Sequence, residues 1–174
     1  MTLALAIEDG PRVWLAADSA ATSTDEGSAE QDTVREPKVW VRGGWGFAFA
    51  GSWRVGALLR LDLDMPPVPR SVDAVERLVQ LELPHRVRAV LTREDPEDAA
   101  STYLIVAARG AAWSGTLWDL TRSSHGYAAI GVPGASMALA ATARLSPRAR
   151  ALAVLHAAAK HQANVRPPFK VERV

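Results

Sequence analysis

The sequence contains no cysteine, which excludes disulfide bonds, thiolate metal sites and a cysteine nucleophile. It has no run of like charges, and its formal net charge is only +1, so the charge pattern indicates neither a nucleic-acid partner nor a helix on a membrane surface. No apolar stretch is long enough to cross a bilayer, because Arg, Asp or Gly interrupts each of the longest ones. These absences leave an ordinary soluble protein as the default.

We also do not expect the N-terminal segment to be a secretory signal. The apolar run at the N-terminus has no basic residues before it, and Glu8 and Asp9 end it after a few positions. We therefore expect a cytoplasmic protein that associates with neither membranes nor nucleic acid.

What the sequence does contain is the composition of a folded protein. Hydrophobic residues make up 48% and charged residues 22% of the 174 positions, which is typical of a globular chain with a substantial core. No internal repeat and no linker-like segment interrupts it. We expect residues 1–174 to form a single domain.

Apolar alternation and turn sequences predict two β-hairpins in the N-terminal part of the chain. Their predicted strands are residues 2–8 paired with 12–18, and residues 37–42 paired with 45–50. The segment between the hairpins, residues 19–36, is rich in Ser, Thr, Asp, Glu and Gly and is predicted to form a loop.

Helices and a second group of strands follow. Helical spacing and capping residues predict helices at 52–62, from Ser71 through Val79, at 134–145 and at 146–163, and a further turn or helix from Pro84 through Leu91. Strands are predicted at 102–108, 111–120, 127–130 and 169–174. Runs of strands that alternate with runs of helices favour an α+β fold, a four-layer α/β/β/α sandwich of two antiparallel sheets.

The candidate chemistry lies at the start of the first strand. If Met1 is removed, the α-amino group of Thr2 can serve as the base for its own hydroxyl. A neighbouring Lys38 ammonium would lower the pKa of that amine, and the Asp18 carboxylate would hold the lysine in place. Backbone N–H groups at the Gly51 turn could receive the oxyanion.

These residues are also close together in the predicted topology. Asp18 ends the strand that pairs with the strand beginning at Thr2, whereas Lys38 begins the next strand and Gly51 ends its partner. Taken singly, each has an ordinary structural explanation: a turn carboxylate, a solvated strand-end lysine and a strand-to-helix turn. Their common register favours a catalytic site.

At this point the sequence resembles the proteasome β-subunit family, most closely the bacterial HslV-type threonine peptidase, over essentially its whole length. The matching segments are the threonine start, Leu15-Ala16-Ala17-Asp18-Ser19-Ala20-Ala21-Thr22, Lys38-Val39, Phe47-Ala48-Phe49-Ala50-Gly51-Ser52 and Ala128-Ala129-Ile130-Gly131.

The resemblance implies an N-terminal-nucleophile hydrolase fold and a homo-oligomeric ring fed with unfolded polypeptide by an ATPase unfoldase. It also implies that Thr2 is the nucleophile, that Asp18 and Lys38 support it, that Gly51 donates to the oxyanion, and that Thr22 and Gly51 bind the substrate backbone as an added strand.

Two positions depart from the family pattern. The family usually has a serine in the turn that here reads Gly131-Val132-Pro133-Gly134; Ser136 lies nearby, but it is expected to face elsewhere as the helix begins. It also places an acidic residue in the last helix, where this chain has Lys160. Losses of such supporting residues reduce activity while leaving a fold intact.

The sequence thus predicts a threonine-type N-terminal-nucleophile peptidase subunit without a cofactor or metal. His156 and His161 are five positions apart on a predicted helix and therefore do not share a face, so they do not indicate a metal site. The alternative, favoured by the two departures, is a non-catalytic or strongly impaired ring or scaffold homologue of the same fold. A small-molecule amidase of the same superfamily has less support.

Overall fold

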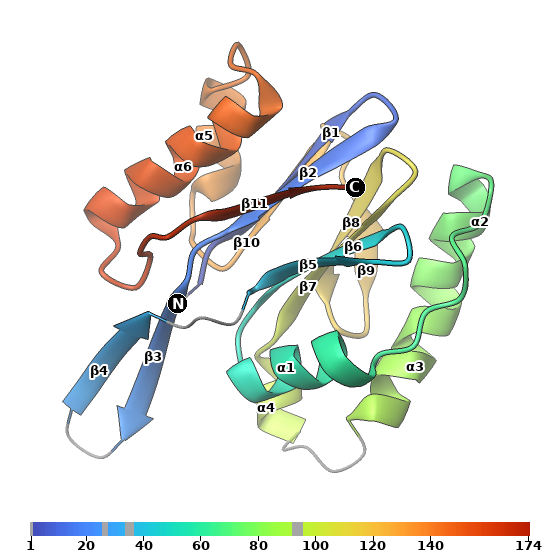
Figure 1. Ribbon diagram of the computed structural model, residues 1–174, viewed down its shortest axis with the longest axis horizontal. Coiled ribbons are helices and arrows are strands. Elements are labelled where there is room, and N and C mark those ends of the chain that lie inside the picture. The colour runs from blue at the N-terminus through green and yellow to red at the C-terminus, as the bar shows by residue number, and fades with distance from the viewer. Residues whose placement is uncertain (1, 26–27, 34–36, 92–95) are drawn as a thin grey trace.

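Two antiparallel sheets form the centre of the computed structural model, which describes residues 2–25, 28–33, 37–91 and 96–174 (Figure 1). The first sheet has the order β10-β1-β2-β11 and the second the order β5-β6-β7-β8-β9. Strands of the first sheet are β1 (Ala4–Asp9), β2 (Arg12–Ala17), β10 (Tyr127–Ile130) and β11 (Lys170–Arg173). Strands of the second are β5 (Val39–Arg42), β6 (Trp45–Ala50), β7 (Tyr103–Ala108), β8 (Ala111–Thr116) and β9 (Leu120–Arg122).

Helices cover the outer face of each sheet. The first sheet is covered by α5 (Ala135–Ala141) and α6 (Pro147–His161). The second is covered by α1 (Trp53–Asp62), α2 (Val72–Arg77), the π-helical segment η1 (Leu78–Glu82) and α3 (Leu83–Val90), with α4 (Pro96–Ala100) before β7. Figure 1 shows the two helical layers on opposite sides of the strands. The expected α+β sandwich of four layers is confirmed.

Residue alternation along the strands explains these layers. In β1 and the residue before it, Leu3, Leu5 and Ile7 pack against α5 and α6, whereas Ala4 and Ala6 face the second sheet. Successive side chains of a strand point to opposite faces, so one segment contributes to two cores. The two predicted hairpins, β1–β2 and β5–β6, are both present.

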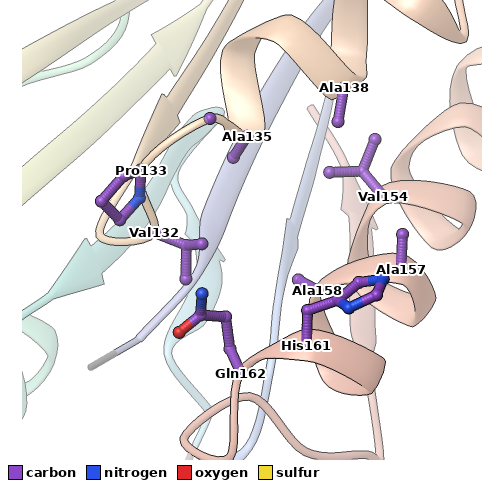
Figure 2. A pocket seen from close by; sticks show the side chains of 10 residues that line it. Val132, Pro133, Ala135, Ala138, Val154, Ala157, Ala158, His161 and Gln162 are labelled. Atoms are coloured by element: carbon purple, nitrogen blue, oxygen red, sulfur yellow. The ribbon is translucent and has the colours of Figure 1, made fainter.

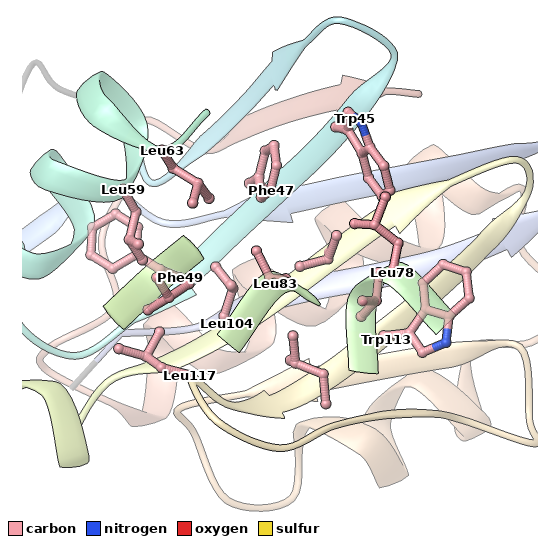
Figure 3. Close-up of a cluster of buried hydrophobic side chains, with 14 of the residues drawn as sticks. Trp45, Phe47, Phe49, Leu59, Leu63, Leu78, Leu83, Leu104, Trp113 and Leu117 are labelled. Atoms are coloured by element: carbon pink, nitrogen blue, oxygen red, sulfur yellow. The ribbon is translucent and has the colours of Figure 1, made fainter. Parts of the chain in front are cut away.

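The largest core lies between the second sheet and its helices. It contains aromatic residues from the strands, and leucines from the helices, from β7 and from the connections after α1 and β8 (Figure 3): Trp45, Phe47, Phe49, Leu59, Leu63, Leu78, Leu83, Leu104, Trp113 and Leu117. Full burial of each such side chain contributes about 1.5–3 kcal/mol. Trp45 and Trp113 therefore serve as packing residues of this core.

The layer between the two sheets is built mainly of small side chains. Its members are Ala4, Ala6, Val13, Leu15, Ala17, Val39, Ala48, Ala50, Ile105, Ala107, Ala112, Ala128 and Ile130. Alanine on both facing surfaces lets the sheets approach closely, and close-packed interiors tolerate added volume poorly.

The predicted loop over residues 19–36 is wrong for the described part of that segment. Residues 20–25 and 28–33 form the antiparallel hairpin of β3 (Ala20–Asp25) and β4 (Ser28–Thr33), beside the N-terminal end of the sandwich (Figure 1). The two strands satisfy each other's backbone groups, which requires no apolar alternation, so the usual sequence signal of a strand was missing.

Smaller differences concern element ends. The predicted strand 111–120 is divided into β8 and β9, and the short α4 was not predicted. Ser71 caps its helix as expected, accepting from Ala74 N, whereas the Ser146 side chain, also expected to cap a helix, makes no capping hydrogen bond. Ser52 caps α1 as well, accepting from Val55 N. Of the helices in the described ranges, none has the length and apolar character required to span a lipid bilayer.

The small-residue layer makes a prediction about stability. Replacing Ala48, which is completely buried between the sheets, with leucine is expected to lower the free energy of unfolding by about 1–3 kcal/mol because the core is overpacked. Urea denaturation measures this change. Ala140→Leu on the exposed side of α5 is the control, and an equal loss in both variants would contradict the proposed tight layer.

Candidate active site

The β1–β2 hairpin brings Asp18 beside the N-terminal residues. Its register pairs Ala4 with Ala17, and the pairing extends one step further through Asp18 N, which donates to Leu3 O at 3.2 Å. The carboxylate is 1% exposed and accepts from Leu3 N and Ala20 N, each at 2.9 Å. Backbone N–H groups therefore fix both carboxylate oxygens on the strand end where Thr2 lies.

Lys38 reaches the same point from the other sheet. Its carbonyl accepts from Phe49 N at 3.1 Å, which extends the β5–β6 ladder by one residue. The side chain is buried, and Nζ lies 2.8 Å from Thr2 Oγ1 and 3.1 and 3.2 Å from the Asp18 oxygens. Nζ also donates to the carbonyl of Ala20. Thr2, Asp18 and Lys38 thus meet between the ends of the two sheets.

The hydrogen bonds of Lys38 define its chemical role. An ammonium has three protons, and here it has three acceptor groups: a hydroxyl, a carboxylate and a carbonyl. Burial lowers the pKa of Lys38 from its usual value, while the charge of Asp18 and its hydrogen bond oppose that change. A charged Lys38 has no lone pair to accept the Thr2 proton, but it can stabilise negative charge on Thr2 Oγ1.

Gly51 forms a rigid turn at the end of β6. Its φ is +131°, a region that favours glycine, and a Cβ there would lie 2.6 Å from Thr102 Cα and 2.7 Å from Ser101 O. The next amide, Ser52 N, donates to the buried Thr102 Oγ1 at 3.1 Å. This turn therefore has a fixed backbone geometry, as an oxyanion donor requires.

The turn after β10 supports Thr2 from another direction. Gly131 has a φ of +97°, and a Cβ added to it would overlap the Thr2 carbonyl oxygen at 1.6 Å and contact the Ala50 side chain at 3.4 Å. Only glycine lets this turn lie against both the Thr2 backbone and the end of β6.

The two positions that depart from the family pattern bring no substitute group. Val132 packs with the apolar core under α5 and α6, Ser136 is exposed on α5, and Lys160 is exposed on α6. The carboxylate that contacts the Thr2–Lys38 pair in the described residues is that of Asp18.

The predicted role of Thr22 and the predicted removal of Met1 concern residues at or beyond the edge of the described structure. Thr22 belongs to β3, where its backbone pairs with Gln31, directly after the Asp18 strand end. Met1 lies outside the described residues, as does the connection between β4 and the residue before Lys38. The roles of Thr2, Asp18, Lys38, Gly51 and Thr22 stay predictions.

Thr2, Asp18 and Lys38, called the candidate triad below, do not line the pocket in this half of the molecule, and the described residues show no metal centre. Within the described ranges, no group of three His, Asp or Glu side chains is arranged to hold a metal ion, and His156 instead packs edge-to-face on Phe169. A pocket of about 200 Å³ lies between α5, α6 and the turn after β10 (Figure 2). Its lining includes Val132 and His161 but none of Thr2, Asp18 and Lys38.

Sequence reasoning missed three contributors to the site. The Ala20 carbonyl accepts from Lys38, the Trp53 ring lies near Lys38 Nζ, and Thr102 holds the turn after Gly51. A carbonyl and a lone threonine give no sequence signal. Trp53 was visible in the sequence as an aromatic residue directly after Gly51-Ser52, but a tryptophan at that position is explained equally well by core packing.

The buried ion pair makes a prediction about stability. Asp18→Asn and Lys38→Met should each lower the free energy of unfolding by about 3–5 kcal/mol, because each leaves a buried charge without its partner. The double variant should lose about 1–3 kcal/mol less than the sum of the two. Urea denaturation of the four proteins measures this coupling.

The partly exposed pair Lys170–Glu172, at 3.2 Å, is the matched control. The cycle of Lys170→Met and Glu172→Gln should give a coupling of no more than about 1 kcal/mol, because solvent screens that pair. If the losses in free energy of unfolding from Asp18→Asn and Lys38→Met were simply additive in the double variant, the two side chains would not be in energetic contact.

Comparisons with known proteins identify the fold. No protein-family model and no curated protein matches the sequence significantly. The solved structure of Thiobacillus denitrificans BPH in complex with epoxomicin is similar over 99% of this chain and 97% of its own, with a TM-score of 0.76 and 19% identity. HslV from Trypanosoma brucei matches over 98% of both chains, with a TM-score of 0.67 and 17% identity.

Anbu, the ancestral β-subunit from Yersinia bercovieri, matches over 98% of this chain and 80% of its own, with a TM-score of 0.68 and 16% identity. At this level of identity the likeness is one of fold. The resemblance inferred from the sequence is confirmed to that extent: the chain has the N-terminal-nucleophile hydrolase fold of HslV, Anbu and BPH.

Proposed function

We propose that this chain is a threonine-type peptidase subunit whose nucleophile is Thr2 after removal of Met1. The observation that carries the proposal is the 2.8 Å contact from Lys38 Nζ to Thr2 Oγ1, made by a lysine that the buried Asp18 carboxylate holds. A fold requires no buried ion pair beside a hydroxyl, and replacing such a pair with apolar residues is often neutral or stabilising.

The first chemical step uses the amine of the same residue. The neutral α-amino group of Thr2 takes the Oγ1 proton as Oγ1 attacks the peptide carbonyl carbon. The Lys38 ammonium lowers the pKa of the amine and stabilises the developing negative charge on Oγ1. The carbonyl oxygen becomes an oxyanion, which accepts from the backbone N–H of Gly51.

The remaining steps return the enzyme to its starting state. The peptide C–N bond breaks, and the leaving amine takes the proton held by the Thr2 α-ammonium, which leaves an ester of Thr2 Oγ1. Water then attacks the ester carbonyl while the α-amine takes a proton from it. Collapse of that intermediate releases the carboxylic acid product and restores the hydroxyl.

An extended peptide is the substrate form that suits this site. Thr22 in β3 and the Gly51 turn can offer backbone groups to either side of an added strand. Binding through the main chain requires an unfolded segment of polypeptide. Unfolded polypeptide is therefore the proposed substrate, and its delivery by an ATPase unfoldase is proposed from the sequence resemblance.

The similar structures support the proposed assembly and reactivity. BPH was solved with epoxomicin bound, and the Anbu complex from Pseudomonas aeruginosa was solved as a helical assembly. The helical assembly supports self-association of this fold, and the closed ring is proposed from the sequence resemblance. We therefore place this chain in a cytoplasmic homo-oligomeric ring, as one domain, with no cofactor. Such a ring would confine the sites and admit only unfolded chains.

A non-catalytic or strongly impaired ring homologue is the second candidate. The observation that favours it is the apolar packing of Val132 and the exposed Lys160, where the family pattern has a hydroxyl and a carboxylate. The triad itself argues against this candidate, since an inactive scaffold has no need to keep the buried Lys38 beside Thr2.

The first test concerns the covalent state of Thr2. Intact-mass measurement of the purified protein should show loss of Met1, and incubation with epoxomicin should add one inhibitor mass per chain. Thr2→Ser should still be labelled, since it keeps the hydroxyl and amine, while Thr2→Ala should lose labelling and peptide hydrolysis by at least about 10³-fold.

Retention of Met1 on a fully assembled protein would exclude the mechanism, because the amine base would be an amide nitrogen. Removal of Met1 without labelling or turnover would favour the scaffold candidate instead.

The second test asks whether the missing hydroxyl limits the site. Val132→Ser should raise the rate of epoxomicin labelling by about tenfold, the scale on which supporting polar residues usually act. Val132→Ala is the matched control, because it removes the same apolar volume without adding a hydroxyl. Equal rates in both variants would show that the hydroxyl at this position is not limiting.

A further inference from the structure

Trp53 lies against the buried lysine. It is the first residue of α1, two positions after Gly51, and its side chain is half-buried. The Trp53 ring lies below Lys38 Nζ, with 5.4 Å from the nitrogen to the ring centroid. This is within the distance of about 6 Å at which a cation is attracted by an aromatic face.

The ring is held in this position by the core of the second sheet. It contacts Phe49 edge-to-face, with centroids 5.4 Å apart and planes at 85°. Phe49 is 1% exposed and packs in turn on Trp40, at 6.2 Å and 61°. A Cβ on Gly56 would overlap the Phe49 ring, so α1 lies directly on that ring and leaves Trp53 little freedom.

The Trp53 ring lies near an ammonium group whose hydrogen bonds are already formed with other residues. All three ammonium protons of Lys38 have oxygen acceptors, so the ring adds attraction for the charge without replacing a hydrogen bond. Asp18, at the end of β2, is the anionic group that contacts Lys38, and the α-amine of Thr2 would face Lys38 from the start of β1. The N-terminal end of α1 carries partial positive charge, which disfavours a nearby cation. The face of the Trp53 ring, at that same helix end, attracts the cation and so offsets this repulsion.

We propose that Trp53 is a positioning residue that acts through Lys38, its ring holding the ammonium beside Thr2 in the charged form. The catalytic consequence rests on the proposed peptidase function. The contact with Lys38 does not, and the two can be tested separately.

The direct experiment is a titration of Lys38. The chain has only three lysines, Lys38, Lys160 and Lys170, so ε-carbon labelling with ¹³C gives three NMR signals, and Lys38→Arg identifies the one of interest. The pKa of Lys38 should be lower in Trp53→Leu than in the parent, because the charged form loses the ring. Trp53→Phe keeps an aromatic face and should fall between the two.

Trp118→Leu is the matched control. It removes another partly exposed indole, one that lies 5.5 Å from the Arg88 guanidinium, and should leave the Lys38 titration unchanged. Near-ultraviolet circular dichroism confirms that each variant is folded. An identical Lys38 titration in the parent and Trp53→Leu would overturn the proposal, whether or not the protein is a peptidase.

The catalytic part is tested by the pH dependence of epoxomicin labelling. A charged Lys38 is required, so a lower pKa should move the alkaline limb of the rate profile to lower pH in Trp53→Leu and less so in Trp53→Phe. A uniform loss of rate with an unmoved limb would show a merely structural role. If the parent is not labelled at all, the peptidase proposal fails, while the NMR titration still decides the contact.

Discussion

The burial of one ammonium group between two sheets is the constraint that organises this end of the molecule. Lys38 Nζ has to find acceptors for three protons without water, and it finds them on Thr2, Asp18 and Ala20. Three separate strand ends must therefore converge on a single point. Desolvation of a charge is costly, so the surrounding hydrogen bonds must hold their geometry for the arrangement to persist.

The small residues between the sheets make that convergence possible. Alanines on the facing surfaces bring the ends of β1, β2 and β5 close enough for one lysine side chain, that of Lys38 directly before β5, to cross the gap. The large side chains lie in the two outer cores, where the helices cover them. The same division fixes Gly131 against the Thr2 carbonyl, because no side chain at that position would fit. The geometry of the site therefore depends on the close packing of the two sheets.

Sequence patterns were reliable wherever a residue's neighbours along the chain determine its environment. Alternation in residues 2–18 and 37–50 predicted both hairpins, and the shared strand ends predicted that Asp18 and Lys38 lie near Thr2. The β3–β4 hairpin was missed because its polar residues carry no apolar alternation. The Ala20 carbonyl and Thr102 were missed because hydrogen bonds across the fold leave no local pattern.

The sequence by itself therefore predicted the layered α+β architecture, which follows from periodicity, turn residues and the order of strands. It also singled out Thr2, Asp18 and Lys38 as candidates, through the chemistry of their side chains, their places at strand ends and the family resemblance. Only the tertiary structure decided that Lys38 is buried with every proton engaged and that the Trp53 ring lies beside its nitrogen. It also decided that the Val132 side chain packs against the apolar core under α5 and α6. These facts depend on contacts between segments far apart in the chain, and desolvation and cation–aromatic attraction act only once those segments are packed together.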